Sequence, residues 1–313
     1  MKKFVVTMLG ALSLLAVTAC GQAPQPSAEN TSAPAANTAP ASAENPAGDG
    51  DTKKIASMSI HLTNNLLALG ITPVGSVIGG DTKAFLPHVA DRLKDTKPLG
   101  VVTDPDMEAL LALKPDVIYL DENYSGKDVA KYEKIAPVEV FNLDDGTWRD
   151  TLKKTGKLVN REAEAEKFVS DYDKQTAHVK ELIHAKLGEG AKVMAIRVTA
   201  KELRVFGMKR PMGPILFDDL GLKPANGVEK IDKAYEVISQ EVLPDFDADA
   251  IFVVVNAGDE AKKVYEQLQA NPLWQGLKAV KQHHIYTIGA QPWLDYSALG
   301  NKMAMDEAEI FFK

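Results

Sequence analysis

Apolar and polar positions alternate between two patterns from residue 53 onward. Short runs of apolar and β-branched residues, typical of buried strands, lie at 54–60, 72–77, 115–120, 135–141, 192–199, 203–206, 250–256 and 284–288. Segments with helical spacing lie between them, at 63–69, 107–113, 213–220, 262–269 and 297–312. This alternation predicts an α/β fold, in which sheets are covered by helices on both faces.

One long helical segment, at 147–187, interrupts the alternation. It contains no proline, and its only glycine is Gly156. The strand and helix pattern resumes after it. We therefore expect two Rossmann-like α/β lobes, at 53–146 and 191–313, joined by one long backbone helix within 147–190. Small ligands bind preferentially at domain interfaces, so a ligand cleft is expected between the lobes.

The first twenty residues form a separate pattern that ends at the single cysteine of the chain. Two lysines precede an apolar run at 4–17, which is too short for a comfortable membrane span. The run ends in Val17-Thr18-Ala19-Cys20, which resembles a bacterial lipobox. That resemblance implies a signal peptide at 1–19, lipidation of Cys20 and a lipid anchor on the outer face of the cytoplasmic membrane. The alternative is an ordinary secretory signal with an incidental cysteine.

Residues 21–52 contain no aromatic or branched aliphatic side chain. Alanine, proline, serine, threonine and asparagine dominate, so this segment has nothing to bury in a core. We expect the lipidated cysteine and this segment, 20–52, to form a disordered tether.

Charge and cysteine content exclude several classes of function. The chain has 36 basic and 43 acidic residues, a formal net charge of −7. Removal of residues 1–19 takes away two lysines and no acid, which gives −9. An acidic chain without a basic cluster argues against nucleic-acid binding. With its single cysteine lipidated, the chain would have no disulfide and no cysteine-based zinc site.

Several short segments, taken in order, point to a known family. They are 69–75 (LGITPVG), 107–118 (MEALLALKPDVI), 220–222 (LGL), 238–243 (ISQEVL), 248–252 (ADAIF), 271–275 (NPLWQ), and the spacing from 279–281 through 285–286 to Trp293. In this order, behind a lipobox and a low-complexity tether, the chain resembles the helical-backbone (class III) substrate-binding lipoproteins of ABC importers. Those proteins take up ferric siderophores, haem or cobalamin. The resemblance implies a monomeric receptor that docks on an ABC permease and its ATPase.

Two acidic residues hold matching positions in the two lobes. Glu108 and Glu241 each lie in the first turn of an expected helix, where an acid complements the helix dipole. That role alone would explain them. The resemblance instead implies that each projects from its lobe and pairs with arginines of the permease, and their duplication favours docking.

The expected ligand is a ferric siderophore, whose oxygen atoms already surround the iron. The protein then supplies guanidinium groups and aromatic walls rather than metal ligands. Candidate ligand-binding residues follow the expected strands: Arg197, Arg204, Arg210, Trp293, Tyr296, Lys83, His88, Arg92 and Tyr124. Arg197 stands out because it lies within an apolar strand, where an arginine is costly unless paired. The modest number of basic residues favours a hydroxamate or citrate-type ligand over a catecholate.

Other ligands and functions are weighed against this interpretation. The six histidines are scattered, so direct metal binding is not expected and no resident cofactor is predicted. Haem is an alternative, since Met212 with a histidine could ligate its iron, and cobalamin is another. A surface-tethered enzyme is a remote alternative, because no GxSxG, HExxH or P-loop pattern occurs. Asp144-Asp145-Gly146 is interpreted as a helix-entry turn with Thr147 as the cap.

Overall fold

The computed structural model describes residues 53–80 and 82–313, which lie in the compact unit Ala47–Lys313. The signal peptide expected at 1–19, the lipidation of Cys20 and the tether expected at 20–52 therefore lie outside the described residues.

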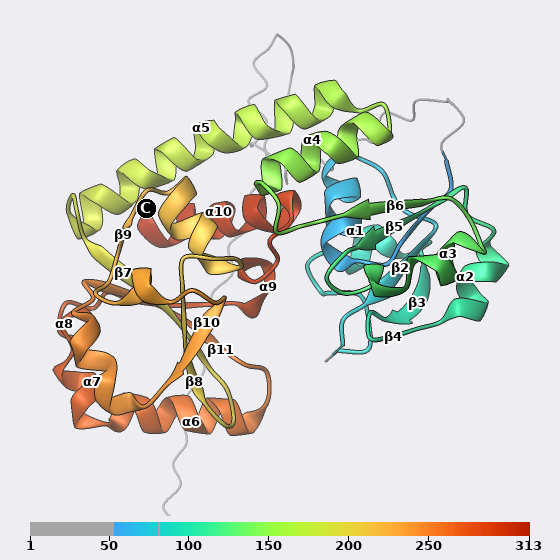
Figure 1. The fold of residues 1–313 in the computed structure, drawn as a ribbon. Helices are drawn as coiled ribbons and strands as arrows, with labels where there is room; N and C mark the ends of the chain where they lie inside the picture. The colour runs from blue at the N-terminus through green and yellow to red at the C-terminus, as the bar shows by residue number, and fades with distance from the viewer. Residues whose placement is uncertain (1–52, 81) are drawn as a thin grey trace, which may run out of the picture. The chain divides into compact units, whose positions relative to one another are not determined.

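The first sheet is built from strands near the start of the described chain (Figure 1). Its order is β4-β3-β2-β1-β5-β6, and all neighbours are parallel except β4 and β3. The strands are β1 (Ile55–Ser57), β2 (Gly75–Ile78), β3 (Lys97–Val101), β4 (Asp104–Pro105), β5 (Val117–Asp121) and β6 (Val138–Phe141). Helices α1 (Ile60–Ala68), α2 (Met107–Leu113) and α3 (Val129–Glu133) connect them. Every residue of β5 is buried, as expected for a parallel strand covered on both faces.

The second sheet has the order β10-β8-β7-β11-β12, with β9 paired to β7. Its strands are β7 (Lys192–Val198), β8 (Leu203–Phe206), β9 (Lys223–Pro224), β10 (Tyr235–Ile238), β11 (Ala250–Val255) and β12 (Ile285–Ile288). Short helices α6 (Asp259–Ala270), α7 (Pro272–Gly276), α8 (Lys278–Lys281) and α9 (Ala290–Trp293) accompany it. Along β11, Phe252 and Val254 enter one core while Ile251 and Val253 enter another. This period of two shows that helices and loops cover both faces of the sheet.

The expected α/β fold with two lobes is confirmed. We call the part of the chain around the first sheet the first lobe, and the part around the second sheet the second lobe. All strands of the first sheet precede residue 147, and all strands of the second follow residue 190. The domain boundaries at these positions stay predictions.

The helical segment between the sheets is two helices rather than one. Helix α4 (Trp148–Leu158) begins at the N-cap Thr147, whose side chain forms a capping box with Asp150, and α5 spans Glu162–Leu187. Asn160, with φ of 53°, reverses the chain between them. A Cβ at Gly156 would lie 2.9 Å from that of Ala165, so the glycine allows the close approach of the two helices. The apolar spacing continues across the break, which is why the sequence predicted a single helix over 147–187, wrongly.

The last helix, α10 (Ala298–Phe312), connects parts of the chain that are distant in sequence. It packs against α5 and α4 and also against α1 of the first lobe. The backbone N–H of Ala298 donates to Oδ1 of Asn65 at 2.8 Å. The lobes are therefore joined both by the α4–α5 segment and by α10.

Some local predictions need correction. Helix α1 begins at Ile60 after Ser59, so Thr63 is not its cap; the Thr63 hydroxyl is buried and lies 2.6 Å from that of Ser76. The helix predicted at 213–220 is a π-helix at Pro214–Asp219. Strands β3, β4, β9 and β10 were not predicted. Within residues 53–80 and 82–313, no helix is long and apolar enough to cross a membrane.

Candidate functional site

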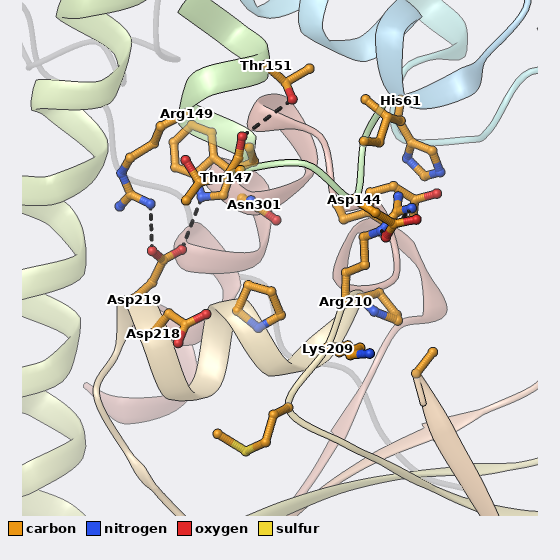
Figure 2. Close-up of a pocket in the computed structure, with 18 of the residues that line it drawn as sticks. His61, Asp144, Thr147, Arg149, Thr151, Lys209, Arg210, Asp218, Asp219 and Asn301 are labelled. Atoms are coloured by element: carbon orange, nitrogen blue, oxygen red, sulfur yellow. Dashed lines mark hydrogen bonds and ion pairs between the residues drawn. The ribbon is translucent and has the colours of Figure 1, made fainter. Parts of the chain in front are cut away.

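A cavity of about 830 Å³ lies between side chains of the two lobes (Figure 2). The first lobe contributes residues of α1 and of the loops that follow β5 and β6. The second lobe contributes residues of the loop after β8 and of the π-helix. Its lining includes the aromatic side chains of Tyr124, Trp148 and Tyr296. The volume falls in the range of small-molecule sites.

The charged residues of the lining balance in number. Four are basic and four are acidic: Arg149, Lys209, Arg210 and Lys233 against Asp144, Asp218, Asp219 and Asp232. Half of these charged residues form two arginine–aspartate pairs, which lie apart in Figure 2. Burial, with Asp219 beside it, raises the pKa of Asp218.

The first pair, Arg210 with Asp144, joins the two lobes. Nε and Nη2 of Arg210 both donate to Oδ1 of Asp144, at 2.7 Å each, and Asn123 donates to the other carboxylate oxygen at 2.6 Å. The Arg210 guanidinium also lies over the ring of Tyr296, 4.2 Å from its centroid. Among the described atoms, Nη1 of Arg210 is buried and has no hydrogen-bond partner. Arg210 therefore has one donor nitrogen that no described atom satisfies.

Tyr296 is held between groups from both lobes. The His61 ring of α1 stacks on the Tyr296 ring, with ring centroids 3.5 Å apart. Burial raises the pKa of the Tyr296 hydroxyl above its usual range, although the nearby Arg210 opposes that shift. The phenol is therefore neutral at physiological pH and can donate a hydrogen bond.

Asp295, next to Tyr296, is a wholly buried carboxylate. It accepts hydrogen bonds from Asn64 Nδ2 at 2.6 Å and from the backbone N–H of Ser297 at 3.1 Å. It also bonds to Nδ1 of His61 at 3.0 Å and to Nε2 of His88 at 3.1 Å. Burial alone would raise the pKa of Asp295, but the hydrogen bonds from the two histidines hold it below its usual range. These contacts fix the segment that carries Tyr296 to the first lobe.

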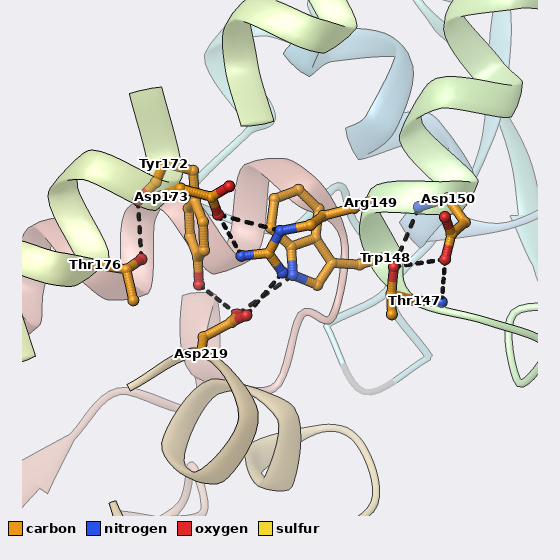
Figure 3. Close-up of polar contacts among 8 residues, drawn as sticks. All are labelled: Thr147, Trp148, Arg149, Asp150, Tyr172, Asp173, Thr176 and Asp219. Atoms are coloured by element: carbon orange, nitrogen blue, oxygen red, sulfur yellow. Dashed lines mark hydrogen bonds and ion pairs between the residues drawn. The ribbon is translucent and has the colours of Figure 1, made fainter. Parts of the chain in front are cut away.

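The second pair, Arg149 with Asp219, lies in a denser network (Figure 3). Nη1 of Arg149 donates to Asp219 at 2.7 Å, and its Nη2 donates to Asp173 at 2.6 Å. Asp219 also accepts from the Tyr172 hydroxyl at 2.8 Å and from the Trp148 indole at 3.3 Å. Burial would lower the pKa of Arg149, but Asp173 and Asp219 raise it overall. This network ties α4 and α5 to the π-helix of the second lobe.

Three of the nine expected ligand-binding residues line the cavity: Arg210, Tyr296 and Tyr124. Tyr124 is well exposed, at 57 %. His88 lies behind the lining, where its side chain is 7 % exposed and bound to Asp295. It supports the site from the interior instead of facing it.

Arg197 and Arg204 do not line the cavity. Arg197 lies on β7, opposite Arg204 of β8, and its Nε donates to Asn256 at 2.6 Å. Arg204 forms an ion pair with Glu202 and lies over the ring of Tyr235, 4.2 Å from the centroid. The cost of an arginine in an apolar strand is thus offset by local partners, without a ligand.

Trp293 and Met212 are wholly buried, which corrects two expectations. The Trp293 indole packs against Phe252 and donates to Glu307 at 2.7 Å. It therefore does not form a wall of the cavity. Met212 belongs to the same core as Trp293, so it does not present its sulfur to a haem in the cavity.

Lys83 and Arg92 also lie away from the lining. Lys83 is exposed in a loop, with φ of 52°. Arg92 donates from Nη2 to the carbonyl of Leu67 near the end of α1, and burial lowers its pKa. Its guanidinium thus completes the carboxyl end of a helix.

Several lining residues were not predicted, chiefly Trp148, Arg149, Asp218 and Asp219. For Trp148 and Arg149 the available signal was the Thr147 cap, because both lie in the first turn after it, near the boundary between the first lobe and the helices. Asp144 was interpreted only as part of a helix-entry turn. That turn is confirmed by the Thr147 capping box, but the carboxylate also reaches the second lobe.

Glu108 and Glu241 are both exposed. Glu108 lies in the first turn of α2, and Glu241 lies in the first turn of the 3₁₀ helix Gln240–Phe246. Each acid thus has the helix-start position expected from the sequence. Their role in docking stays a prediction.

Within the described residues, no group of three or more histidine, cysteine, aspartate or glutamate side chains is arranged to hold a metal ion. The chemistry of the cavity is instead that of a binding site. It offers guanidinium and ammonium groups, a neutral phenol and aromatic faces.

Comparisons with known proteins agree with this geometry. A probable siderophore-binding lipoprotein of Bacillus subtilis, YfiY, is 31 % identical over 83 % of this chain and 82 % of its own length. The iron-uptake system-binding protein of the same organism is 28 % identical over 93 % of this chain and 92 % of its own. The crystal structure of Staphylococcus aureus SirA complexed with staphyloferrin B is similar with a TM-score of 0.72 and 28 % identity, over 83 % of this chain and 92 % of SirA. The model of the periplasmic binding protein family matches residues 55–292, and the chain belongs to that family.

Proposed function

We propose that this protein is the extracytoplasmic substrate-binding lipoprotein of an ABC importer and captures a ferric siderophore for iron uptake. The observation that carries the proposal is the cavity of about 830 Å³, which is lined by aromatic side chains from both lobes and by cationic side chains of α4 and the second lobe. Relatives named as siderophore-binding, iron(3+)-hydroxamate-binding and Fe(3+)-citrate-binding proteins support it. The membership of a family of substrate-binding proteins supports a binding function rather than catalysis.

Arg210 and Tyr296 are the residues we propose for ligand contact, with Tyr124 at the rim. The guanidinium of Arg210, which lines the cavity, suits a hydroxamate or carboxylate oxygen. The aromatic faces suit the hydrocarbon parts of a siderophore. The iron arrives as cargo with its own ligands, so no resident cofactor is required.

Binding is tested by quenching of tryptophan fluorescence. Trp148 lines the cavity, whereas Trp274 and Trp293 are 3 % and 0 % exposed. The purified protein is titrated with ferric hydroxamate, citrate-type and catecholate complexes, and with haem, cobalamin and zinc. We expect saturable submicromolar quenching by a ferric siderophore, weakened about tenfold by Arg210→Gln.

Arg204→Gln is the matched control, because Arg204 is also a paired arginine but lies outside the cavity lining. It should leave the affinity unchanged. A response to haem or cobalamin alone would keep the receptor function and replace the ligand. Equal weakening by both variants would contradict the proposed site.

Delivery to a permease is the second part of the proposal. We propose that Cys20 anchors the protein to the membrane and that Glu108 and Glu241 pair with basic residues of the permease. The double variant Glu108→Gln with Glu241→Gln should bind the siderophore normally but support little uptake by cells. A control double variant at two other exposed acids, Glu133→Gln with Glu266→Gln, should support normal uptake.

A further inference from the structure

The Arg210–Asp144 pair poses a question that the proposed function does not answer. A ligand oxygen that reached Arg210 would meet a guanidinium whose Nε and Nη2 already contact one oxygen of Asp144. The resident carboxylate thus occupies the position that an anionic ligand group would take.

The surroundings of the pair hold Asp144 in this position. Asn123 donates to its second oxygen, and the backbone N–H of Asp144 donates to the side chain of Asn142 at 2.9 Å. The Asp144 side chain is 59 % exposed, whereas that of Arg210 is 18 % exposed. The acid is therefore accessible from the cavity while the base is largely covered.

A second carboxyl group lies near the pair on the first-lobe side. Asp121 is almost completely buried, and burial raises its pKa, as does the nearby Asp144, whereas Arg210 opposes the shift. Since the basic and acidic residues of the lining are equal in number, the cavity offers little net attraction to a highly charged anion. The affinity of a neutral ligand would not be reduced by this balance of charges.

We propose that Asp144 is a specificity-determining residue, which occupies Arg210 and favours ferric siderophores of low net charge over strongly anionic ones. This inference rests on the proposed function. Three hydroxamates balance the charge of iron(III), so a ferric trihydroxamate core is neutral. Three catecholates leave a net charge of minus three on the complex, and that complex is repelled by the Asp144 carboxylate.

The test compares the wild-type protein with Asp144→Asn and Asp145→Asn. Asp145 is the adjacent exposed acid outside the cavity lining, so its substitution makes the same change in net charge. The probes are ferrichrome, a neutral trihydroxamate complex, and ferric bacillibactin, a triscatecholate complex. Both affinities are measured at two salt concentrations, and thermal unfolding checks that each variant is folded.

We expect the wild type to prefer ferrichrome. Asp144→Asn should strengthen binding of ferric bacillibactin by about tenfold or more, and change that of ferrichrome by less than about threefold. Asp145→Asn should leave both affinities unchanged. An unchanged preference in Asp144→Asn, or an equal shift in Asp145→Asn, would overturn the inference while leaving the proposed function intact.

A double-mutant cycle tests whether Asp144 acts through Arg210. In an Arg210→Gln background, the part of the gain from Asp144→Asn that comes from freeing Arg210 should disappear, so the gain for ferric bacillibactin should be smaller and reflect only relief of direct repulsion. Persistence of the full gain would overturn the claim that Asp144 acts by occupying Arg210. Failure of wild type and all variants to bind any ferric siderophore would instead overturn the proposed function, and the inference with it.

Discussion

The two arginine–aspartate pairs of the cavity are chemically alike but differ in what surrounds them. Asp219 has a side chain only 5 % exposed and accepts from an arginine, a tyrosine and a tryptophan. Asp144 is 59 % exposed, and its arginine keeps a buried donor without a partner. The number of partners and the burial, rather than the pair itself, separate a structural contact from one that a ligand can exchange.

Removal of Asp219 should give the largest effect on stability. Asp219→Ala leaves Arg149, Tyr172 and Trp148 without their shared acceptor, which should cost about 3 kcal/mol of unfolding free energy. Urea denaturation measures the change. Asp173→Ala, which removes the more exposed partner of Arg149, should cost less than about 1 kcal/mol. Equal effects would contradict the distinction between the two pairs.

Asp295 tests whether a buried carboxylate that has no arginine partner, but takes part in several hydrogen bonds, also stabilises the fold. Asp295→Asn should cost about 2 kcal/mol at neutral pH, because it disturbs several buried hydrogen bonds. The pKa of Asp295 is held below its usual range in the folded protein, so its contribution to stability is present above about pH 4 and is lost as the pH falls further.

The pH dependence of the unfolding free energy checks this prediction. Unfolding free energies are compared at neutral and acidic pH for the wild type and for Asp295→Asn. The loss of stability in acid should be smaller in the variant. Asp306→Asn, at a half-exposed carboxylate on α10, is the control and should leave the acid limb unchanged.

Arg210→Gln should have a small effect on folding, in contrast to its effect on ligand affinity. Its partner Asp144 is largely solvated, so the variant should lose less than about 1 kcal/mol of stability. Arg149→Gln should lose more, since Asp219 is buried. Urea denaturation of both variants checks the order, and a larger loss for Arg210→Gln would reverse the comparison.

The smallest expected change is the movement of the lobes when a ligand binds. Helices α4, α5 and α10 all connect the two lobes, and Asp295 bonds to His61 and His88 of the first lobe. We expect a rotation of only a few degrees. Structures of the free and loaded protein would measure it, and a rotation of tens of degrees would contradict this prediction.

The sequence was sufficient for most of the fold, because strands such as β11 and helices such as α2 carry a strong local pattern. It did not reveal the turn at Asn160, since the apolar spacing of α4 continues into α5. The short edge strands β4 and β9, at two residues each, carry too little pattern to be detected.

The site was harder to predict, because side-chain direction and distant partners decide it. Arg197 and Trp293 occur in suitable segments, yet Asn256 and Glu307 satisfy them within the second lobe. Arg210 and Tyr296 were identified because they lie on loops. Asp144 has a local role that explains it, so its contact with Arg210, 66 positions away, could not be inferred from its neighbours.

The position of α10 has a consequence for the order in which the chain can fold. Asp295 and Ala298 supply partners to His61, Asn64 and Asn65, more than two hundred positions earlier in the chain. These polar side chains of α1 therefore lack their hydrogen-bond partners until nearly the last residues of the chain are present. Contacts of such long sequence separation slow folding. The first lobe to be synthesised is thus completed by the last helix to be made.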